Sequence, residues 1–228
     1  MVREILVHDG SVALQQPEQQ IARRTANRGK PKPRRVAVFI DGSNLYFKLR
    51  SLIPSKMDFI GYRYRDLALS LLGQGEKLSY IGYYVGVVRD TKRTRDHEKT
   101  LELLRNQQKL FEQLRHQGVS IVKGYLLERD GTYFEKGVDV RLAIDIVTMA
   151  QARSYDAGVV ISSDTDLIPA IQAAQGLKRE IVYVGFEHQP SLALIRQADR
   201  SRLITRGEAE ALTTIKLAVN RFDQQGQA

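Results

Sequence analysis

Short apolar runs alternate with amphipathic segments along most of the chain. The first run, Val36–Ile40, contains three β-branched residues and is typical of a strand buried on both faces of a parallel sheet. Apolar or alternating segments predict further strands at 77–88, 119–127, 157–162, 180–185 and 203–204. Helical spacing of apolar residues predicts helices at 45–50, 64–72, 100–116, 137–153, 164–175, 190–197 and 208–221.

This alternation predicts an α/β fold with a mostly parallel central sheet flanked by helices. The dipeptide Asp130-Gly131 is a hairpin signal, so we expect the chain to double back there into a short strand at 132–134.

The two ends of the chain differ from its centre. Residues 1–33 are rich in Gln, Arg, Lys and Pro and too poor in apolar residues to pack, which predicts a basic, disordered arm. We therefore divide the chain into this arm at 1–33, a folded domain at 34–205, and a C-terminal helix with a polar tail at 206–228. The arm could contact phosphates or act as a passive tether, and its composition favours neither.

Composition narrows the functional classes. The 228 residues include no cysteine, which excludes disulfides, thiolate zinc sites and cysteine nucleophiles. No apolar run approaches the length of a membrane span, so we expect a cytoplasmic protein with no membrane partner. The net charge of +9 favours a polyanionic partner, of which nucleic acid is the commonest.

The first candidate site residue is Asp41, which follows the first strand directly. Ligands of open α/β sheets bind at the carboxyl ends of strands, so a carboxylate at this place predicts a site. The alternative is that Asp41 only satisfies the backbone of the turn. Ser43 or Asn44 is expected to cap the helix that follows.

The second candidate is Asp139, in the first turn of the helix at 137–153. On a helical projection it shares the apolar face with Leu142 and Ile146, so we expect it to point inward, which is costly unless it binds a partner. The alternative is a capping residue that gains from the helix dipole. Asp145 is interpreted mainly as an ion-pair partner of Arg141, four residues earlier.

The third candidate stretch, Ser162-Ser-Asp-Thr-Asp166, follows the strand at 157–162. Asp164 is the stronger ligand candidate. Asp166 could equally close a capping box with Ser163. Backbone amides at this helix start could also position a phosphate.

Acids on one rim of a sheet make an oxygen-lined pocket that suits Mg²⁺ or Mn²⁺ rather than zinc. Such ions act on phosphate esters. The chain has no G-x-x-x-x-G-K-[ST] loop and no G-x-G-x-x-G fingerprint after its first strand, so the sequence offers no competing phosphate-binding apparatus.

Asp41-Gly-Ser-Asn44, Lys136-Gly-Val-Asp139 and Ser162-Ser-Asp-Thr-Asp166 together resemble the three motifs of NYN domains of the LabA-like group, within the PIN-like nucleases. The resemblance covers about residues 34–205, with the motifs in the right order. It implies a PIN-like three-layer sandwich with clustered acids that bind Mg²⁺ or Mn²⁺ and cut RNA. It also implies a possible homodimer, since PIN-like domains often pair.

By this resemblance, Asp41, Asp139 and Asp164 match the motif acids, Asp166 matches an additional acid, and Asn44 matches the asparagine that supports the site. We expect catalysis and metal binding from these acids. The expected substrate-binding residues are Ser43, Ser163, Lys92, Arg93 and Arg95. The three cations belong to a basic stretch that could equally be a solvated charge run. Ser163 stands where the family usually has glycine, so the loop would differ if that position needs a positive φ.

Two functions follow from these observations. The first is a metal-dependent ribonuclease that hydrolyses phosphodiester bonds. The second is a binding or regulatory module that keeps the fold and contacts RNA or protein without cutting.

Overall fold

The computed structural model describes residues 32–53, 58–87, 97–129 and 132–213. The chain divides into two units, Met1–Lys32 and Pro33–Ala228, and apart from Lys32 all described residues belong to the second unit. The predicted arm at 1–33 therefore lies almost wholly outside the described residues, as does the tail beyond 213.

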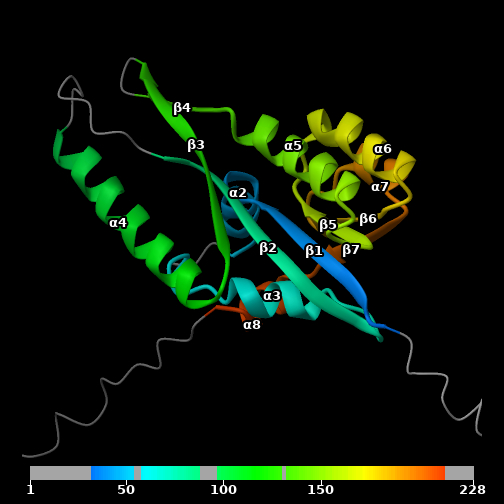
Figure 1. Cartoon of the computed structure of the whole chain (residues 1–228). Helices are drawn as coiled ribbons and strands as arrows, with labels where there is room; N and C mark the ends of the chain where they lie inside the picture. Colours follow the sequence, from blue (N-terminus) through cyan, green and yellow to red (C-terminus); the bar gives the residue numbers. More distant parts are fainter. Residues whose placement is uncertain (1–31, 54–57, 88–96, 130–131, 214–228) are drawn as a thin grey trace, which may run out of the picture. The chain divides into compact units, whose positions relative to one another are not determined.

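The second unit is built on one seven-stranded sheet with the order β4-β3-β2-β1-β5-β6-β7. Six strands run parallel, and β4 pairs antiparallel with β3 at one edge. Figure 1 shows this arrangement, with β1 at the centre of the sheet. The elements are β1 (Arg34–Asp41), α2 (Gly42–Leu52), α3 (Tyr64–Ser70), β2 (Glu76–Val87), α4 (His97–His116), β3 (Ser120–Arg129), β4 (Thr132–Lys136), α5 (Val138–Gln151), β5 (Ala157–Ile161), η1 (Thr165–Leu167), α6 (Ile168–Gly176), β6 (Glu180–Phe186), α7 (Leu192–Gln197), β7 (Arg200–Ile204) and α8 (Arg206–Ala211).

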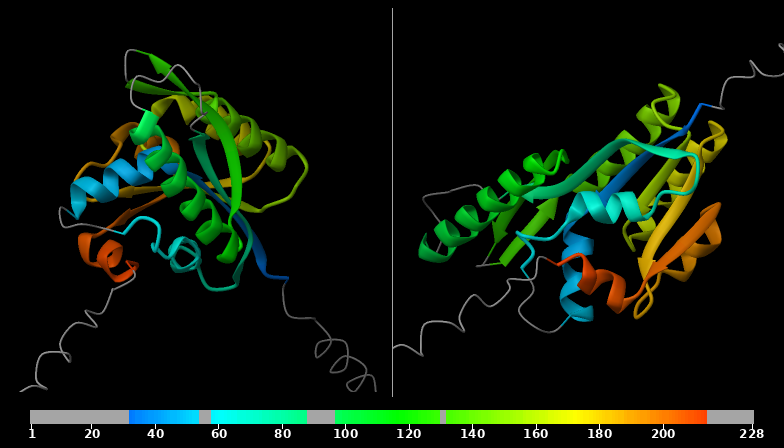
Figure 2. Two further views of the ribbon diagram at one scale, coloured as in Figure 1. Left: turned by 90° about the vertical axis from the view of Figure 1, so that its left-hand side faces the viewer. Right: turned by 90° about the horizontal axis from the view of Figure 1, so that it is seen from below.

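The sheet is buried on both faces, which gives the three-layer α/β sandwich that the sequence predicts. Alternate residues of β1 belong to two separate cores, because successive side chains of a strand point to opposite faces. Val36, Val38 and Ile40 pack with side chains of α2, α3, α4 and α8. Ala37 and Phe39 pack with side chains of α5, α6 and α7. Figure 2 shows the two helical layers from two further directions.

The predicted parallel strands and the hairpin are confirmed, with shifts at several element ends. α4 begins at His97 rather than 100, and β7 begins at Arg200 rather than 203. The last helix is the clearest difference, since α8 begins at Arg206 and ends at Ala211. Its start is fixed by a capping box between Thr205 and Glu208, a T-x-x-E pattern that the sequence prediction overlooked. None of the helices within the described ranges is long and apolar enough to cross a membrane.

Ion pairs join the amino ends of the central strands. Asp156, just before β5, accepts hydrogen bonds from the backbone N–H of Arg35 at 2.8 Å and from its Nη2 at 2.9 Å. Beside it, Arg34 forms ion pairs with Glu76 of β2 and Glu180 of β6. These contacts help to hold β1 in register with its neighbours at the amino ends of the parallel strands.

The hydrogen bonds from Arg35 lower the pKa of the Asp156 carboxyl to about 2. A carboxyl whose pKa is lower in the folded state stabilises the fold above its ordinary pKa and loses that contribution as the pH falls through the folded value. We expect Asp156→Asn to reduce the free energy of unfolding at pH 7 by about 1–2 kcal/mol. The difference from the wild type should shrink between about pH 4 and pH 2 in urea titrations.

Asp66→Asn is the matched control, because Asp66 forms an exposed ion pair with Arg63 at 3.2 Å. Such surface pairs contribute about 0–1 kcal/mol. An Asp156→Asn difference that stays constant between pH 7 and pH 2 would contradict the assignment.

Candidate functional site

Asp41 is the last residue of β1 and a buried charged residue, only 4% exposed. Its Oδ1 accepts a hydrogen bond from the backbone N–H of Asn44 at 2.9 Å, so Asp41 itself caps α2. The expectation that Ser43 or Asn44 caps this helix is therefore wrong. The reason is that Asp41 has extended backbone angles and the helix already begins at Gly42, which places the aspartate at the capping position.

Gly42 lets the turn after Asp41 lie directly against β2. A Cβ atom at this position would lie 2.5 Å from Cε1 of Tyr83 and 2.8 Å from the carbonyl oxygen of Tyr84. The backbone oxygen has little room to shift, so a side chain here would push the turn away from the sheet. The glycine thereby holds Asp41 at the level of the strand ends.

A buried serine connects the first and third motifs. Ile40 of β1 pairs with Ile161 of β5, which brings Asp41 beside Ser162. The Ser162 hydroxyl donates to Oδ2 of Asp41 at 2.8 Å and accepts from the backbone N–H of Asp164 at 3.1 Å. Ser162 is 2% exposed, so this bridge is shielded from water. Ser162 received no separate role from the sequence, because only the pairing of β5 with β1 places it beside Asp41.

Asp164 begins the turn that follows β5. Its Oδ1 accepts from the backbone N–H of Asp166 at 2.9 Å, so Asp164, rather than Ser163, caps the short helix η1. The alternative in which Asp166 closes a capping box with Ser163 is therefore wrong, and Asp166 is exposed at the surface. Among the described non-glycine residues, a positive φ occurs at Arg153 and Lys178, so Ser163 fits its loop without the glycine that the family usually has.

Asp139 lies in the first turn of α5 but is exposed, so the predicted inward orientation is wrong. The buried stripe of α5 begins one residue earlier, at Val138, and continues through Leu142, Ile146 and Ala150. Val138 takes the inner position because it packs against Gly124 of β3, where a Cβ would meet the Val138 side chain at 2.3 Å. Asp139 therefore lies beside the buried stripe, at the surface of the helix start.

Asp145 lies further along α5 and has two partners. Arg141 is within 3.2 Å, which confirms the predicted ion pair. The second partner is the buried Tyr84, whose hydroxyl donates to Oδ2 of Asp145 at 3.1 Å. Burial, Tyr80 and the nearby Asp145 carboxylate raise the pKa of Tyr84, so its phenol keeps the proton that it donates. Tyr84 also pairs with Asp41 across β1 and β2, so it belongs to both neighbourhoods.

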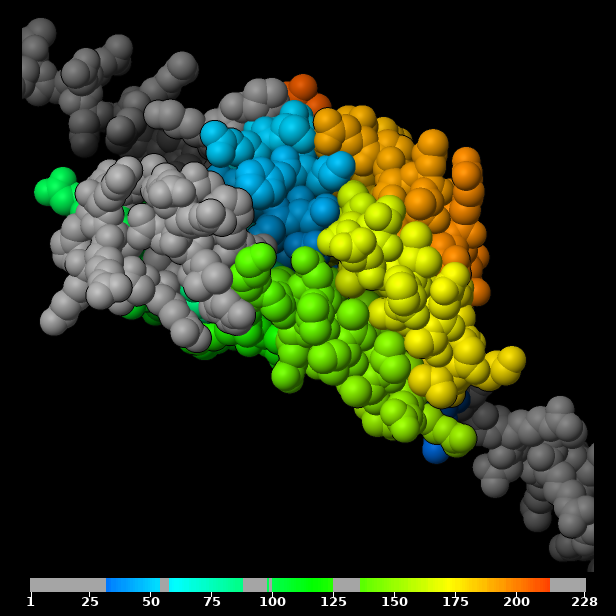
Figure 3. Space-filling model, turned by 90° about the horizontal axis from the view of Figure 1, so that it is seen from above, coloured from blue at the N-terminus to red at the C-terminus, as the bar shows by residue number. Residues whose placement is uncertain are grey.

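The structure brings some of the predicted site residues together and leaves others apart. Asp41 and Asp164 are joined through Ser162, and Asn44 contacts Asp41 through its backbone. Figure 3 shows that α2, the start of α5 and the segment after β5 meet on one face. Ser43 and Ser163 are half-buried on this face. Lys92, Arg93 and Arg95 lie outside the described residues.

The described acids are not grouped as a ready-made metal site. Within residues 32–53, 58–87, 97–129 and 132–213, no group of three or more His, Cys, Asp or Glu is placed to hold a metal ion. The donor set itself fits a hard cation, because carboxylate oxygens are the ligands that Mg²⁺ and Mn²⁺ prefer. Asp41 and Asp164 are held in place, whereas Asp139 and Asp166 are exposed side chains.

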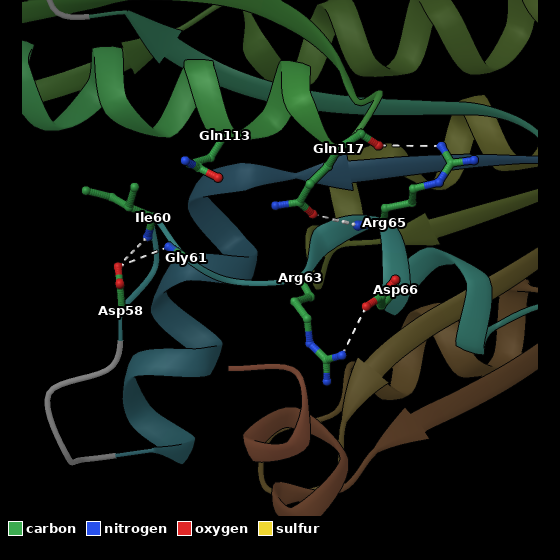
Figure 4. Close-up of a pocket in the computed structure, with 8 residues that line it drawn as sticks. All are labelled: Asp58, Ile60, Gly61, Arg63, Arg65, Asp66, Gln113 and Gln117. Carbon is green, nitrogen blue, oxygen red and sulfur yellow. Dashed lines mark hydrogen bonds and ion pairs between the residues drawn. The ribbon is translucent and has the colours of Figure 1, made fainter. Parts of the chain in front are cut away.

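A pocket elsewhere in the domain contains none of these residues. It lies between the loop before α3, α3 itself and the end of α4, and it is lined by Asp58, Ile60, Gly61, Arg63, Arg65, Asp66, Gln113 and Gln117. Figure 4 shows that each of its charged side chains has a hydrogen-bond or ion-pair partner among the lining residues. Arg63 pairs with Asp66, and the backbone N–H of Arg65 donates to Oε1 of Gln117 at 3.1 Å. The bond to Gln117 joins α3 to the residue that follows α4, so the pocket lies where these two helices are packed together.

The comparison with known families settles the classification. The family model described as the NYN domain matches residues 35–205, which span all three motifs and the sheet from β1 to β7. The chain belongs to the NYN domain family. This family suggests a nuclease-like function on a PIN-like fold.

A solved structure supports the fold of this NYN domain. A protein of unknown function from Vibrio parahaemolyticus matches with a TM-score of 0.55 and 22% sequence identity, over 77% of this chain and 95% of that chain. At this identity the likeness carries the fold alone. No curated protein matches the chain.

The bridge through Ser162 gives a prediction for stability. In Ser162→Ala, Asp41 loses a donor and the backbone N–H of Asp164 loses an acceptor in a buried place. We expect the free energy of unfolding in urea to fall by about 1–3 kcal/mol. Ser70→Ala is the control, because the Ser70 hydroxyl donates to a backbone carbonyl within its own helix, away from the acids. A loss for Ser162→Ala no larger than that of the control would show that the bridge does not support the site.

Proposed function

We propose that this NYN protein is a metal-dependent ribonuclease of the LabA-like group. The observation that carries the proposal is the buried Asp41, held by the backbone of Asn44 and the hydroxyl of Ser162 at the carboxyl end of β1. A buried carboxylate is costly, and one fixed by two donors at the ligand-binding edge of a parallel sheet is suited to a cation.

Asp41 and Asp164 would hold Mg²⁺ or Mn²⁺, and the exposed Asp139 and Asp166 would complete the ligand set. Bound at this edge, a divalent ion would supply an activated water and would stabilise the displaced oxygen of a phosphodiester. The proposal requires Asp139 or Asp166 to turn toward Asp41, because the described residues contain no ready group of three ligands. Exposed side chains change rotamer within nanoseconds, so such a movement needs no change in the fold.

The other residues have supporting parts in this proposal. Asn44 and Ser162 orient Asp41, as the hydrogen-bond partners of a ligand commonly do. Ser43 and Ser163, half-buried on the same face, would contact the substrate backbone. RNA as the substrate is supported by the net charge of +9, to which Lys92, Arg93 and Arg95 contribute. A cytoplasmic location and a homodimer stay predictions.

A second function is favoured by one observation. The exposed positions of Asp139 and Asp166 leave the described acids without a preformed metal cluster. A NYN domain that only binds RNA or protein would need no such cluster. Metal-dependent cleavage separates the two functions.

Cleavage of labelled single-stranded and structured RNAs, with Mn²⁺, with Mg²⁺ and with EDTA, tests the proposal. We expect the wild type to cut RNA only with a metal ion. We expect Asp41→Asn to lower the cleavage rate by at least about 100-fold, since replacing a residue that only hydrogen-bonds to a metal ligand already lowers activity by about 10- to 100-fold. Asparagine can still cap α2, so the variant should fold, which circular dichroism checks.

Asp164→Asn should lose activity in the same way, whereas Asp66→Asn, distant from the acids, should keep it. Undiminished cleavage by Asp41→Asn would exclude this site as the catalytic one. Salt-sensitive binding of RNA without cleavage would favour the binding module.

A further inference from the structure

An aromatic ring stands exposed on the helix that begins at Asp41. Phe47 of α2 is 65% exposed, the highest value among the large hydrophobic side chains in the described residues that face water. Its ring packs edge-on against Tyr46 with 5.3 Å between ring centroids, and the ring centroids of Tyr46 and Phe59 lie 4.4 Å apart. Phe47 therefore has an aromatic neighbour beside it, and most of its surface is open to solvent.

The position of Phe47 on α2 directs the ring toward the site. It follows Ser43 by four residues and Asn44 by three, so all three share one side of the helix. Side chains on a helix lean toward its N-terminus, so Phe47 leans toward Ser43 and Asn44 in the first turn of α2. Asp41 precedes Phe47 by six residues, which advance the helix axis by about 9 Å, so the ring lies less than two helical turns from Asp41.

The surroundings of Phe47 do not resemble an apolar docking patch. Its neighbours three and four residues away on α2 are Ser43, Asn44, Arg50 and Ser51, all of which are polar. A protein partner that buries apolar area needs a contiguous patch. An exposed ring of a small aromatic cluster, with polar neighbours along its own helix, instead fits a planar ligand that carries charge on its own backbone.

The charge of α2 complements such a ligand. The helix contains Lys48 and Arg50 and no acidic residue. Arg50 donates from Nη1 to the hydroxyl of Tyr46 at 3.3 Å, which keeps a guanidinium beside the aromatic cluster. Cations that surround stacking rings are the usual composition of sites for single-stranded nucleic acid.

Contacts between α2 and the loop after β6 hold the surface around Phe47 in place. Lys48 donates from Nζ to the backbone carbonyl of Gln189 at 2.9 Å, and the hydroxyl of Ser51 lies 2.8 Å from Nε2 of His188. The loop that holds His188 and Gln189 follows β6 at the same edge of the sheet as Asp41. α2 is thus attached to the carboxyl end of β1 and to the loop after β6, which restricts the movement of the helix that carries Phe47.

We propose that Phe47 stacks against a nucleobase of a single-stranded substrate and so places the adjoining phosphodiester beside Asp41. This inference rests on the proposed nuclease function and names its substrate class. Bases in a duplex are stacked on one another, so only an unpaired base can lie flat on this ring. Phe47 is a positioning residue that selects single-stranded over double-stranded nucleic acid.

The test measures binding apart from cleavage. Full-length protein is titrated in EDTA against a fluorescein-labelled single-stranded oligonucleotide of about 12 nucleotides and a duplex of the same length, with anisotropy as the readout. We expect Phe47→Ala to weaken single-strand binding by about 5- to 100-fold and to leave duplex binding unchanged. Phe47→Tyr, which keeps an aromatic ring, should bind as the wild type does.

Two controls separate stacking from a loss of apolar surface. Phe47→Leu keeps an apolar side chain without a ring and should bind as weakly as Phe47→Ala. Leu192→Ala removes another exposed apolar side chain, 62% exposed on α7, and should bind as the wild type does. Equal melting temperatures would show that the variants fold alike.

The outcomes distinguish this proposal from the proposed function. Wild-type single-strand affinity in both Phe47→Ala and Phe47→Leu, or an equal loss for the duplex, would overturn the stacking role even if the wild type cuts RNA. A wild type that binds no single strand would overturn it as well. Ring-dependent binding by a protein that cuts nothing would support the stacking role and remove the nuclease.

Discussion

Burial of β1 on both faces is the constraint on which the rest of the structure depends. Alternate side chains of this one strand belong to the two cores, so both helical layers are built around it. Its neighbours β2 and β5 run in the same direction and in fixed register, which brings three strand ends to one edge. The acids of the first and third motifs meet there because the backbone ladder brings them there. Their meeting requires no special loop.

At the carboxyl end of β1, the carboxylate of Asp41 has a structural role and is also the proposed metal ligand. Asp41 caps α2 through one oxygen and accepts a hydrogen bond from the hydroxyl of Ser162 through the other, which confirms its role in the turn, while its role as a ligand stays a prediction. The capping bond fixes the start of α2, and the start of α2 fixes where Phe47 stands. A single carboxylate therefore orients the helix and marks the place where chemistry would occur.

The sequence was sufficient for whatever depends on periodicity. The run at Val36–Ile40 predicted the central strand, and the spacing of Arg141 and Asp145 predicted their ion pair. The sequence prediction was wrong where the packing of a single residue determines which of two adjacent side chains is buried. The helical projection placed Asp139 inward because it could not see that Gly124 opens a space for Val138. Likewise, Ser162 gained its role only through pairing with a strand more than a hundred residues away, which local patterns do not contain.

The amino and carboxyl ends of the parallel strands have different roles. Arg34 and Arg35, the first two residues of β1, form ion pairs with carboxylates, whereas Asp41, its last residue, lies beside Ser162. The seven steps from Arg34 to Asp41 span about 23 Å. The exposed Lys178 lies in the turn before β6, at the same edge as Arg34. A fluorophore or surface linker attached at that turn would leave the acids facing the solution, so the fold offers a ready handle for single-molecule work.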